Sequence, residues 1–440
     1  MPLQTSPCIA TVAFVTMGCA KNEVDSDHMA LRLTRAGYGI VDDPEHADVV
    51  IVNTCSFIQA ATEESIEAIL EVAGYDSVAS GASKLVVAGC MPARYGADLE
   101  PEFPEVSSFL SCSKEQDIVA SVDKIIGTER LVGADRNVAL DLQGDARVFA
   151  YVKISDGCDR FCAYCTIPFI RGRYHSYTYD DIRDEVERVV SEGAREIVLI
   201  AQDTGRWGTD FENPSTLAQL MHRLAEEWPE IWFRVMYIQP EGVTDELIQT
   251  VKDHENICSY FDIPFQHANA RVLKSMNRKG SGSEFLGLIH HIRDLIPDAA
   301  IRTTLIAGYP GETDDDFDEL CDFVDEAELD YVGVFAYSRE EGTRAYKLEN
   351  QVDEDEKASR AQILRDRADA ACAPRIAERV GKTLDVLVCG AEEDGQLFGR
   401  AQCQAPDVDG VTYIPSGKAG QFVTVTIDDT LLYEMEGSFA

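Results

Sequence analysis

The segment SDGCDRFCAYCTIP, residues 155–168, decides the fold of the central part of this chain. It contains three cysteines in C-x3-C-x2-C spacing: Cys158, Cys162 and Cys165. A cubane iron–sulfur cluster has four irons, so three thiolates leave one iron open, whereas a structural zinc site normally closes with a fourth ligand. His175 lies ten residues beyond Cys165, and no other Cys or His completes the set nearby. The spacing therefore favours an open-site iron–sulfur cluster over a closed zinc site.

An alternation of apolar and amphipathic runs surrounds this segment. Six runs predict strands, at residues 151–155, 196–201, 232–238, 260–264, 301–307 and 331–337. Helical patterns separate them, which is typical of parallel β/α units. Six strands fall short of the eight in a complete barrel. We therefore expect an open, partial (β/α)6 barrel whose site lies at the carboxyl ends of its strands.

The N-terminal region shows a second α/β pattern. Residues 10–16, 49–54 and 84–88 predict parallel strands, and residues 23–36 and 62–73 predict helices. A cysteine follows each strand: Cys19, Cys55 and Cys90. Neighbouring parallel strands bring their carboxyl ends to one edge, so these thiols could hold a second open-site cluster. Separate buried cysteines that only fill the core are the alternative.

The C-terminal region is different in kind. A long charged segment, residues 353–379, predicts a connecting helix. Four short β-rich runs follow, at residues 384–389, 398–402, 411–415 and 422–427, as in a small antiparallel barrel. With a variable stretch around residues 127–146, three domains are expected, at residues 8–130, 145–374 and 375–440.

Composition narrows the function classes. The chain has 440 residues, 13 cysteines and a net charge of −39. That charge disfavours binding to a phosphate backbone and suits a basic protein partner, although acidic solubility is an equally good explanation. Residues 375–440 contain five basic and eleven acidic residues. No signal peptide or apolar run of about 20 residues is found, which predicts a cytoplasmic protein without a membrane segment, and cytosolic cysteines indicate metal or redox chemistry.

The central triplet, with the aromatic Tyr164 directly before its last cysteine, resembles the signature of the radical S-adenosylmethionine (SAM) superfamily. The resemblance implies a [4Fe–4S] cluster on Cys158, Cys162 and Cys165 whose open iron binds SAM. Cleavage of SAM would give a 5′-deoxyadenosyl radical. Tyr164 is then expected near the adenine, with packing as its alternative role.

Other strand ends are weaker candidates for the SAM pocket. They are Gln202 and Asp203, and the turn formed by Gly308, Pro310 and Gly311, which a tight turn alone would also explain. Arg171 and Arg173 could meet carboxylates or simply face solvent.

The order of modules resembles the methylthiotransferase family over nearly the whole chain. The stretches that carry the resemblance are GCAKNEVDSD (18–27), NTCSFIQAATEESI (53–66), DGCDRFCAYCTIPFIRG (156–172), FDIPFQHANARVLKSMNR (261–278) and GRAQCQAPDVDG (399–410). They are similar to the branch that modifies an aspartate of small-subunit ribosomal protein uS12. The tRNA branch has Gln-Ser-Gly where this chain has Gln266-His267-Ala268. One departure is Tyr177, where the family usually carries arginine.

The family resemblance implies a radical SAM methylthiotransferase. Its cofactors would be SAM and two [4Fe–4S] clusters, the second held by Cys19, Cys55 and Cys90. The radical would remove hydrogen from the aspartate β-carbon, the second cluster would present sulfur, and a second SAM would supply the methyl group. The C-terminal barrel resembles a TRAM domain, an external electron donor is implied, and direct nucleic-acid binding is not expected. A tRNA methylthiotransferase and a non-enzymatic iron–sulfur carrier are the rival hypotheses.

Overall fold

The computed structural model describes residues 5–127, 137–139 and 147–439. Its contacts divide the chain into two compact units. The N-terminal unit comprises Met1–Asp145, Gly157–Asp159 and Cys165–Tyr174, and the C-terminal unit comprises Ala146–Asp156, Arg160–Tyr164 and His175–Ala440. The expected variable stretch around 127–146 lies almost wholly outside the described residues, as do the expected domain limits at 130, 145 and 440. No described helix has the length and apolar character needed to cross a bilayer.

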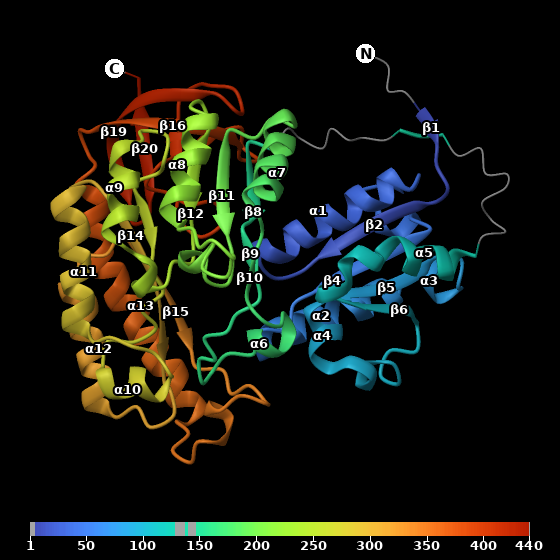
Figure 1. The fold of residues 1–440 in the computed structure, drawn as a ribbon, viewed down its shortest axis with the longest axis horizontal. Coiled ribbons are helices and arrows are strands. Elements are labelled where there is room, and N and C mark those ends of the chain that lie inside the picture. The colour runs from blue at the N-terminus through green and yellow to red at the C-terminus, as the bar shows by residue number, and fades with distance from the viewer. Residues whose placement is uncertain (1–4, 128–136, 140–146, 440) are drawn as a thin grey trace. The chain divides into compact units, whose positions relative to one another are not determined.

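The N-terminal unit is built on a five-stranded parallel sheet of order β3-β2-β4-β5-β6 (Figure 1). Its strands are β2 (Thr11–Thr16), β3 (Gly39–Ile40), β4 (Val49–Thr54), β5 (Lys84–Gly89) and β6 (Val106–Ser111). Its helices are α1 (Ala20–Arg35), α2 (Gln59–Ala73), α3 (Asp76–Ala79), α4 (Cys90–Tyr95) and α5 (Ile118–Ile126). Two short strands, β1 (Thr5–Pro7) and β7 (Asn137–Ala139), pair antiparallel outside this sheet.

Both faces of this sheet are covered by helices, which explains its continuous apolar strands. Val50 and Val52 pack with α2, α3 and α4, whereas Val49 and Ile51 pack with α1 and α5. The expected strands β2, β4 and β5 and the helices α1 and α2 are confirmed. Strand β6 was not predicted, because this edge strand (VSSFLS) is only partly buried and carries three serines.

The C-terminal unit contains six parallel strands that alternate with helices. They form two three-stranded sheets, β8-β11-β12 and β13-β14-β15. An isolated parallel bridge pairs Phe233 of β12 with Ile257, which precedes β13. The strands are β8 (Phe149–Lys153), β11 (Glu196–Ile200), β12 (Trp232–Val235), β13 (Tyr260–Asp262), β14 (Ala300–Ala307) and β15 (Tyr331–Ala336). Within the described part of the chain no ladder joins β8 to β15, so the expected open, partial (β/α)6 barrel is confirmed.

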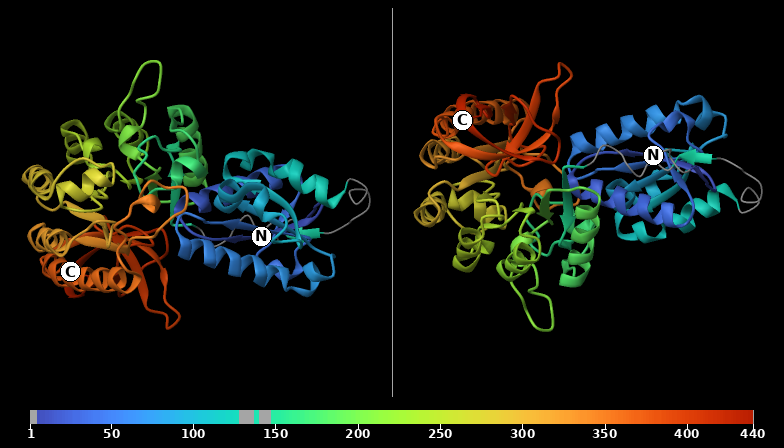
Figure 2. Two further views of the ribbon diagram at one scale, coloured as in Figure 1. Left: turned by 90° about the horizontal axis from the view of Figure 1, so that it is seen from below. Right: turned by 90° about the horizontal axis from the view of Figure 1, so that it is seen from above.

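Helices cover the outside of these strands in both views of Figure 2. They are α7 (Tyr179–Ser191), α8 (Leu217–Glu227), α9 (Asp245–Asp253), α10 (Ala270–Ser275), α11 (Gly282–Leu295), α12 (Asp314–Glu326) and α13 (Glu354–Ala377), the last being the expected connecting helix. Capping boxes start α7, α8 and α12 at Thr178, Thr216 and Thr313, where the threonine hydroxyl satisfies an otherwise unpaired backbone N–H.

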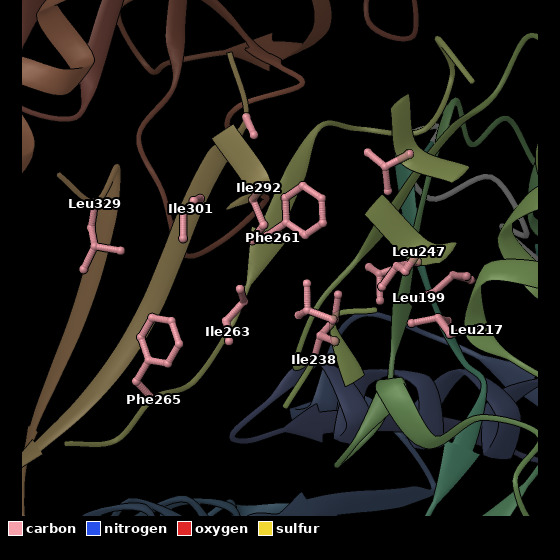
Figure 3. Close-up of a cluster of buried hydrophobic side chains, with 14 of the residues drawn as sticks. Leu199, Leu217, Ile238, Leu247, Phe261, Ile263, Phe265, Ile292, Ile301 and Leu329 are labelled. Carbon is pink, nitrogen blue, oxygen red and sulfur yellow. The ribbon is translucent and has the colours of Figure 1, made fainter. Parts of the chain in front are cut away.

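A large apolar core joins strands and helices in this unit. Figure 3 shows side chains from several of these elements, Leu199, Leu247, Phe261 and Ile301 among them, gathered in it. Phe265 stacks on Phe285 with ring centroids 4.4 Å apart. This packing holds the strands at one end and leaves their carboxyl-end loops to build a site.

The C-terminal strands form a closed barrel of order β16-β17-β18-β20-β19. They are β16 (Thr383–Ala391), β17 (Leu397–Ala401), β18 (Thr412–Ile414), β19 (Phe422–Leu431) and β20 (Glu434–Ser438). The expected small barrel is confirmed, but β18 and β20 pair parallel, and this pairing closes the ring. Strand β20 was not predicted because its sequence, EMEGS, has no apolar run.

A buried group of charges joins this barrel to the amino ends of the β/α strands. Glu196, the first residue of β11, accepts from Arg234 Nε at 2.7 Å, and Arg400 Nη1 of the barrel lies 2.6 Å from its other oxygen in a less well aligned ion pair. Burial works to raise the pKa of Glu196, but the two arginines hold it below its usual range. The barrel therefore occupies the end of the strands opposite to their carboxyl ends.

We expect Glu196→Gln to lower the free energy of unfolding by about 3–5 kcal/mol, because it leaves two buried arginines without their counter-charge. Urea unfolding followed by tryptophan fluorescence measures this, since Trp232 packs against Phe422 of the barrel. Asp184→Asn, which breaks an exposed pair with Arg183, is the control and should leave the unfolding curve nearly unchanged. Equal, small effects of both substitutions would contradict this role of the buried charges.

Candidate active site

The cysteines Cys19, Cys55 and Cys90 form what we call the N-terminal cysteine triad. Cys19 caps the start of α1 after β2, Cys55 follows β4, and Cys90 is the first residue of α4 after β5. Strand β4 pairs parallel with both β2 and β5, so the three carboxyl ends lie at one edge of the sheet. Burial, and then the nearby thiol groups of Cys19 and Cys90, raise the pKa of Cys55 to about 12. The expected convergence of the triad is therefore seen in the structure.

Two glycines permit this convergence. Gly18 has φ +96°, and a Cβ there would lie 2.4 Å from Cys55 Cβ. Gly89 has φ +98°, and a Cβ there would lie 2.5 Å from the carbonyl oxygen of Thr54. Each glycine directly precedes a triad cysteine. The Gly-Cys pairs therefore let the outer two loops approach the loop that carries Cys55, a reason that sequence reasoning missed.

Two buried asparagines tie the same loops together. Asn22 Nδ2 donates to the carbonyl oxygens of Met17 and Thr54, both at 2.9 Å. Asn53 Nδ2 donates to the carbonyl oxygen of Asn22 at 2.8 Å. These bonds fix the relative positions of the loops that carry Cys19 and Cys55.

Arg171 brings a buried positive charge to the triad. Its Nη2 donates to Asp25 Oδ2 and Asn22 Oδ1, each at 2.8 Å, and lies 3.8 Å from Cys90 Sγ. The side chains of Arg171 and Asp25 are each only 2% exposed. Arg171 was predicted either to contact a carboxylate or to face solvent, and the contact with a carboxylate is therefore confirmed.

Cys112, which is not among the cysteines predicted as ligands, lies beside Cys90. Both thiols belong to one small buried cluster with Ile170. The hydrogen bond from Cys112, followed by the charge of Arg171, lowers the pKa of Cys90 against the effect of burial. Because the thiolate is the form that binds metals, this environment suits a metal ligand.

The central cysteines lie in the segment between β9 (Ser155–Asp156) and β10 (His175–Ser176), which pair antiparallel. At the base of this segment the backbone N–H of Cys158 donates to the carbonyl oxygen of Gly172 at 3.1 Å. Gly157 has φ +73°, and a Cβ there would lie 2.2 Å from the carbonyl oxygen of Arg173. Tyr177, the departure from the family pattern, follows β10, and its ring packs edge-on against that of His175.

The part of this segment that belongs to the C-terminal unit is anchored at strand ends. Arg160 donates to Asp203 Oδ2 at 2.7 Å, so Asp203, a candidate for the SAM pocket, already has a partner in the chain. The backbone N–H of Ala163 donates to the carbonyl oxygen of Met276 at 2.8 Å. These contacts hold the chain on both sides of Cys162.

Arg278 is a site residue that sequence reasoning quoted within a motif but gave no role. Its side chain is half-buried, and its guanidinium donates to Gln239 and to the carbonyl oxygen of Pro264. Burial works to lower the pKa of Arg278, but nearby Tyr164 and Cys162 raise it overall, and Arg278 hydrogen-bonds to the Cys162 thiol. Each cysteine set therefore has one arginine beside a thiol.

Gln202 and Tyr164 offer the features expected of a SAM pocket. Both polar atoms of the Gln202 side chain are buried, and no described residue is their hydrogen-bond partner. Such an amide fits a polar group of a bound ligand, because a buried amide without a partner is costly. Tyr164 is half-buried against an apolar cluster that includes Val272, Met276 and Tyr309. Both residues are therefore candidates for contact with SAM.

The turn after β14 is stabilised within the chain. Glu312 accepts from the backbone N–H of Gly308 at 2.9 Å, from Arg360 at 2.9 Å and from His267 Nε2 at 3.2 Å. Burial opposes ionisation of Glu312, but His267 and Arg360 hold its pKa below the usual range. A Cβ at Gly308 would lie 2.5 Å from Lys357 Cγ. Contacts within the chain thus account for this turn. His267, one of the residues that distinguish the two branches of the family, has Glu312 as its buried partner.

Family models match three parts of the chain. The uncharacterized protein family UPF0004 matches residues 11–111, the radical SAM superfamily matches residues 152–324, and the TRAM domain matches residues 380–439.

Relatives match the chain over nearly its whole length. Proteins named ribosomal protein uS12 methylthiotransferase RimO are 39% identical in Clostridioides difficile (97% of this chain, 98% of theirs) and 41% identical in Trichlorobacter lovleyi (96% and 97%). Among solved structures, the radical SAM methyltransferase TsrM from Kitasatospora setae, with cobalamin and a [4Fe–4S] cluster bound, has a TM-score of 0.54 at 13% identity, over 74% of this chain and 72% of that one. This last likeness concerns the fold alone.

We expect Gly18→Ala to lower the midpoint of urea unfolding of the N-terminal unit clearly, because its methyl group would overlap Cys55. Gly81→Ala is the matched control: Gly81 also has positive φ (+76°), but no atom lies within 4 Å of its Cβ position. If both substitutions lowered the midpoint equally, backbone strain alone would explain the effect and the close approach would be irrelevant.

Proposed function

Because the chain belongs to the RimO family of radical SAM methylthiotransferases, we propose that it attaches a methylthio group to the β-carbon of an aspartate in small-subunit ribosomal protein uS12. The observation that carries this proposal is the full-length match at 39–41% identity. The cysteine positions support it, because both sets sit in loops that follow strands.

A radical SAM enzyme uses an iron–sulfur cluster and SAM. We assign Cys158, Cys162 and Cys165 to the cluster that binds SAM, and the N-terminal cysteine triad to a second cluster. When bound, the two clusters and SAM supply the radical, the sulfur and the methyl group, which no side chain provides at neutral pH. Each set leaves one iron of a cubane without a protein thiolate, and an arginine lies beside one thiol of each set.

The chain's own residues position and shield these groups. Gln202 offers a buried amide to the polar part of SAM, and Tyr164 offers a ring face to its adenine. The ion pair between Arg160 and Asp203 holds the central segment against the end of β11. Cys112 and Arg171 lower the pKa of the Cys90 thiol.

The charge of the C-terminal barrel supports a basic protein substrate rather than RNA. Four of the five basic residues in 375–440 lie close to acidic residues of this chain: Arg375 with Glu378, Arg379 with Asp330, Lys382 with Asp298, and Arg400 with Glu196. These four basic side chains are therefore already paired with acidic residues of this chain. Residues 375–440 also contain eleven acidic residues. Binding to a phosphate backbone needs basic residues that remain available.

The substrate test is a reaction of the cluster-loaded enzyme with SAM, reductant and either uS12 or tRNA. We expect deoxyadenosine formation and a methylthio mass gain on one aspartate of uS12. A mass gain on tRNA adenosine instead would support the rival methylthiotransferase, and cluster-loaded protein that forms no deoxyadenosine with either substrate would indicate an iron–sulfur carrier.

Single cysteine substitutions separate the two sets. Cys158→Ala should abolish deoxyadenosine formation, while Cys55→Ala should retain it and lose the methylthio product. Cys321→Ala, a buried cysteine of α12 outside both sets, is the control and should retain both activities. Equal loss of both activities in Cys55→Ala, with the central cluster still present by iron analysis, would contradict this assignment.

A further inference from the structure

Three metal-ligating side chains meet on the surface of the C-terminal unit, and none of them belongs to a cysteine set. His222 and Glu226 lie on α8, and His254 follows the end of α9. The candidate donor atoms of these three residues all lie within 4.8 Å of one another. Nothing in the chemistry of the proposed methylthiotransferase uses them.

The distances fit one small cation. His222 Nδ1 and His254 Nε2 are 3.1 Å apart, and Glu226 Oε1 lies 3.7 Å from His254 Nε2. Two nitrogens bound tetrahedrally at about 2.0–2.1 Å from a zinc ion are roughly 3.3–3.4 Å apart. The observed separation of the two nitrogens is therefore within a few tenths of an ångström of the value that a shared ion requires.

Helix α8 and a hydrogen bond of His254 orient these three side chains. Residues four apart share one helix face, so His222 and Glu226 point to the same side of α8. The carbonyl oxygen of Thr250 lies 3.0 Å from His254 Nδ1. A hydrogen bond there keeps the proton on Nδ1 and turns the lone pair of Nε2 towards His222, as in histidines that bind metals.

Neighbouring charged groups are engaged elsewhere. Glu227 accepts from the hydroxyl of Tyr179 at 2.5 Å, and Arg223 lies over the ring of Tyr179 at 3.3 Å from its centre. Glu226 is thus the carboxylate of this helix turn that faces the imidazoles. A direct hydrogen bond between the two rings is the competing explanation for their closeness, and it predicts no affinity for a metal.

We propose that His222, Glu226 and His254 form a binding site for zinc or a similar divalent transition-metal ion, with water completing the coordination. Two imidazoles and one carboxylate suit such an ion, whereas Mg²⁺ and Ca²⁺ prefer oxygen ligands alone. The bound ion links α8 to the end of α9 and stabilises the outer layer of the β/α barrel. The proposal does not depend on the proposed function.

The test uses full-length protein with its iron–sulfur clusters reconstituted anaerobically, so that the ligand cysteines are occupied. Equilibrium dialysis against Zn²⁺, with metal analysis, compares the unmodified chain with His254→Gln. The matched control is His290→Gln, which replaces an exposed histidine of α11. Iron content is measured in every sample, so that loss of clusters is not mistaken for loss of this site.

We expect the unmodified chain and His290→Gln to bind one zinc ion that His254→Gln binds at least about tenfold more weakly. Excess Mg²⁺ should not displace it, and zinc should raise the melting temperature of the first two proteins only. Equal zinc affinity in all three proteins, at equal iron content, would overturn the proposal.

Discussion

Parallel strands that neighbour one another end at the same edge of a sheet, and both candidate sites depend on this constraint. In the N-terminal unit, β2, β4 and β5 deliver Cys19, Cys55 and Cys90 to one edge. The approach is close enough that Gly18 and Gly89 have no room for a side chain. In the C-terminal unit, the central cysteine segment is held by Asp203 and by the loop after α10, which follow β11 and β13. The cysteines are far apart in sequence, but the sheet brings the triad together.

Charged side chains inside the fold serve two purposes: they lie beside the candidate ligand thiols, and they attach the small barrel. Arg171, which is buried, and Arg278, which is half-buried, each place a guanidinium beside a thiol. Glu196, Arg234 and Arg400 form a separate group that joins the small barrel to the amino ends of the strands. Arg400, the arginine that the barrel contributes to this group, is buried.

The sequence predicted the architecture well because its strands are buried on both faces and therefore read as apolar runs, as in Val49–Thr54. It failed for β6 and β20, whose serine and acidic residues carry no such signal. The central cysteines were found from their spacing, and Cys19, Cys55 and Cys90 from their positions after predicted strands and from the family resemblance. Asn22, Asn53 and Cys112 were missed because their roles arise from contacts across the fold, and the grouping of His222, Glu226 and His254 likewise joins residues of two helices. The Gly-Cys pairs were visible in the sequence, and a glycine directly before a cysteine at a strand end is the signal that could have revealed them.

The central claim is that two cysteine triads each hold one cubane cluster. The most direct measurement is the iron and sulfide content of anaerobically reconstituted protein, together with Mössbauer spectra, for the unmodified chain, Cys55→Ala and Cys158→Ala. The account predicts about eight irons per chain in the unmodified protein and about four in each variant, with the remaining signal differing between the two variants. About four irons in the unmodified chain, unchanged in Cys55→Ala, would contradict it.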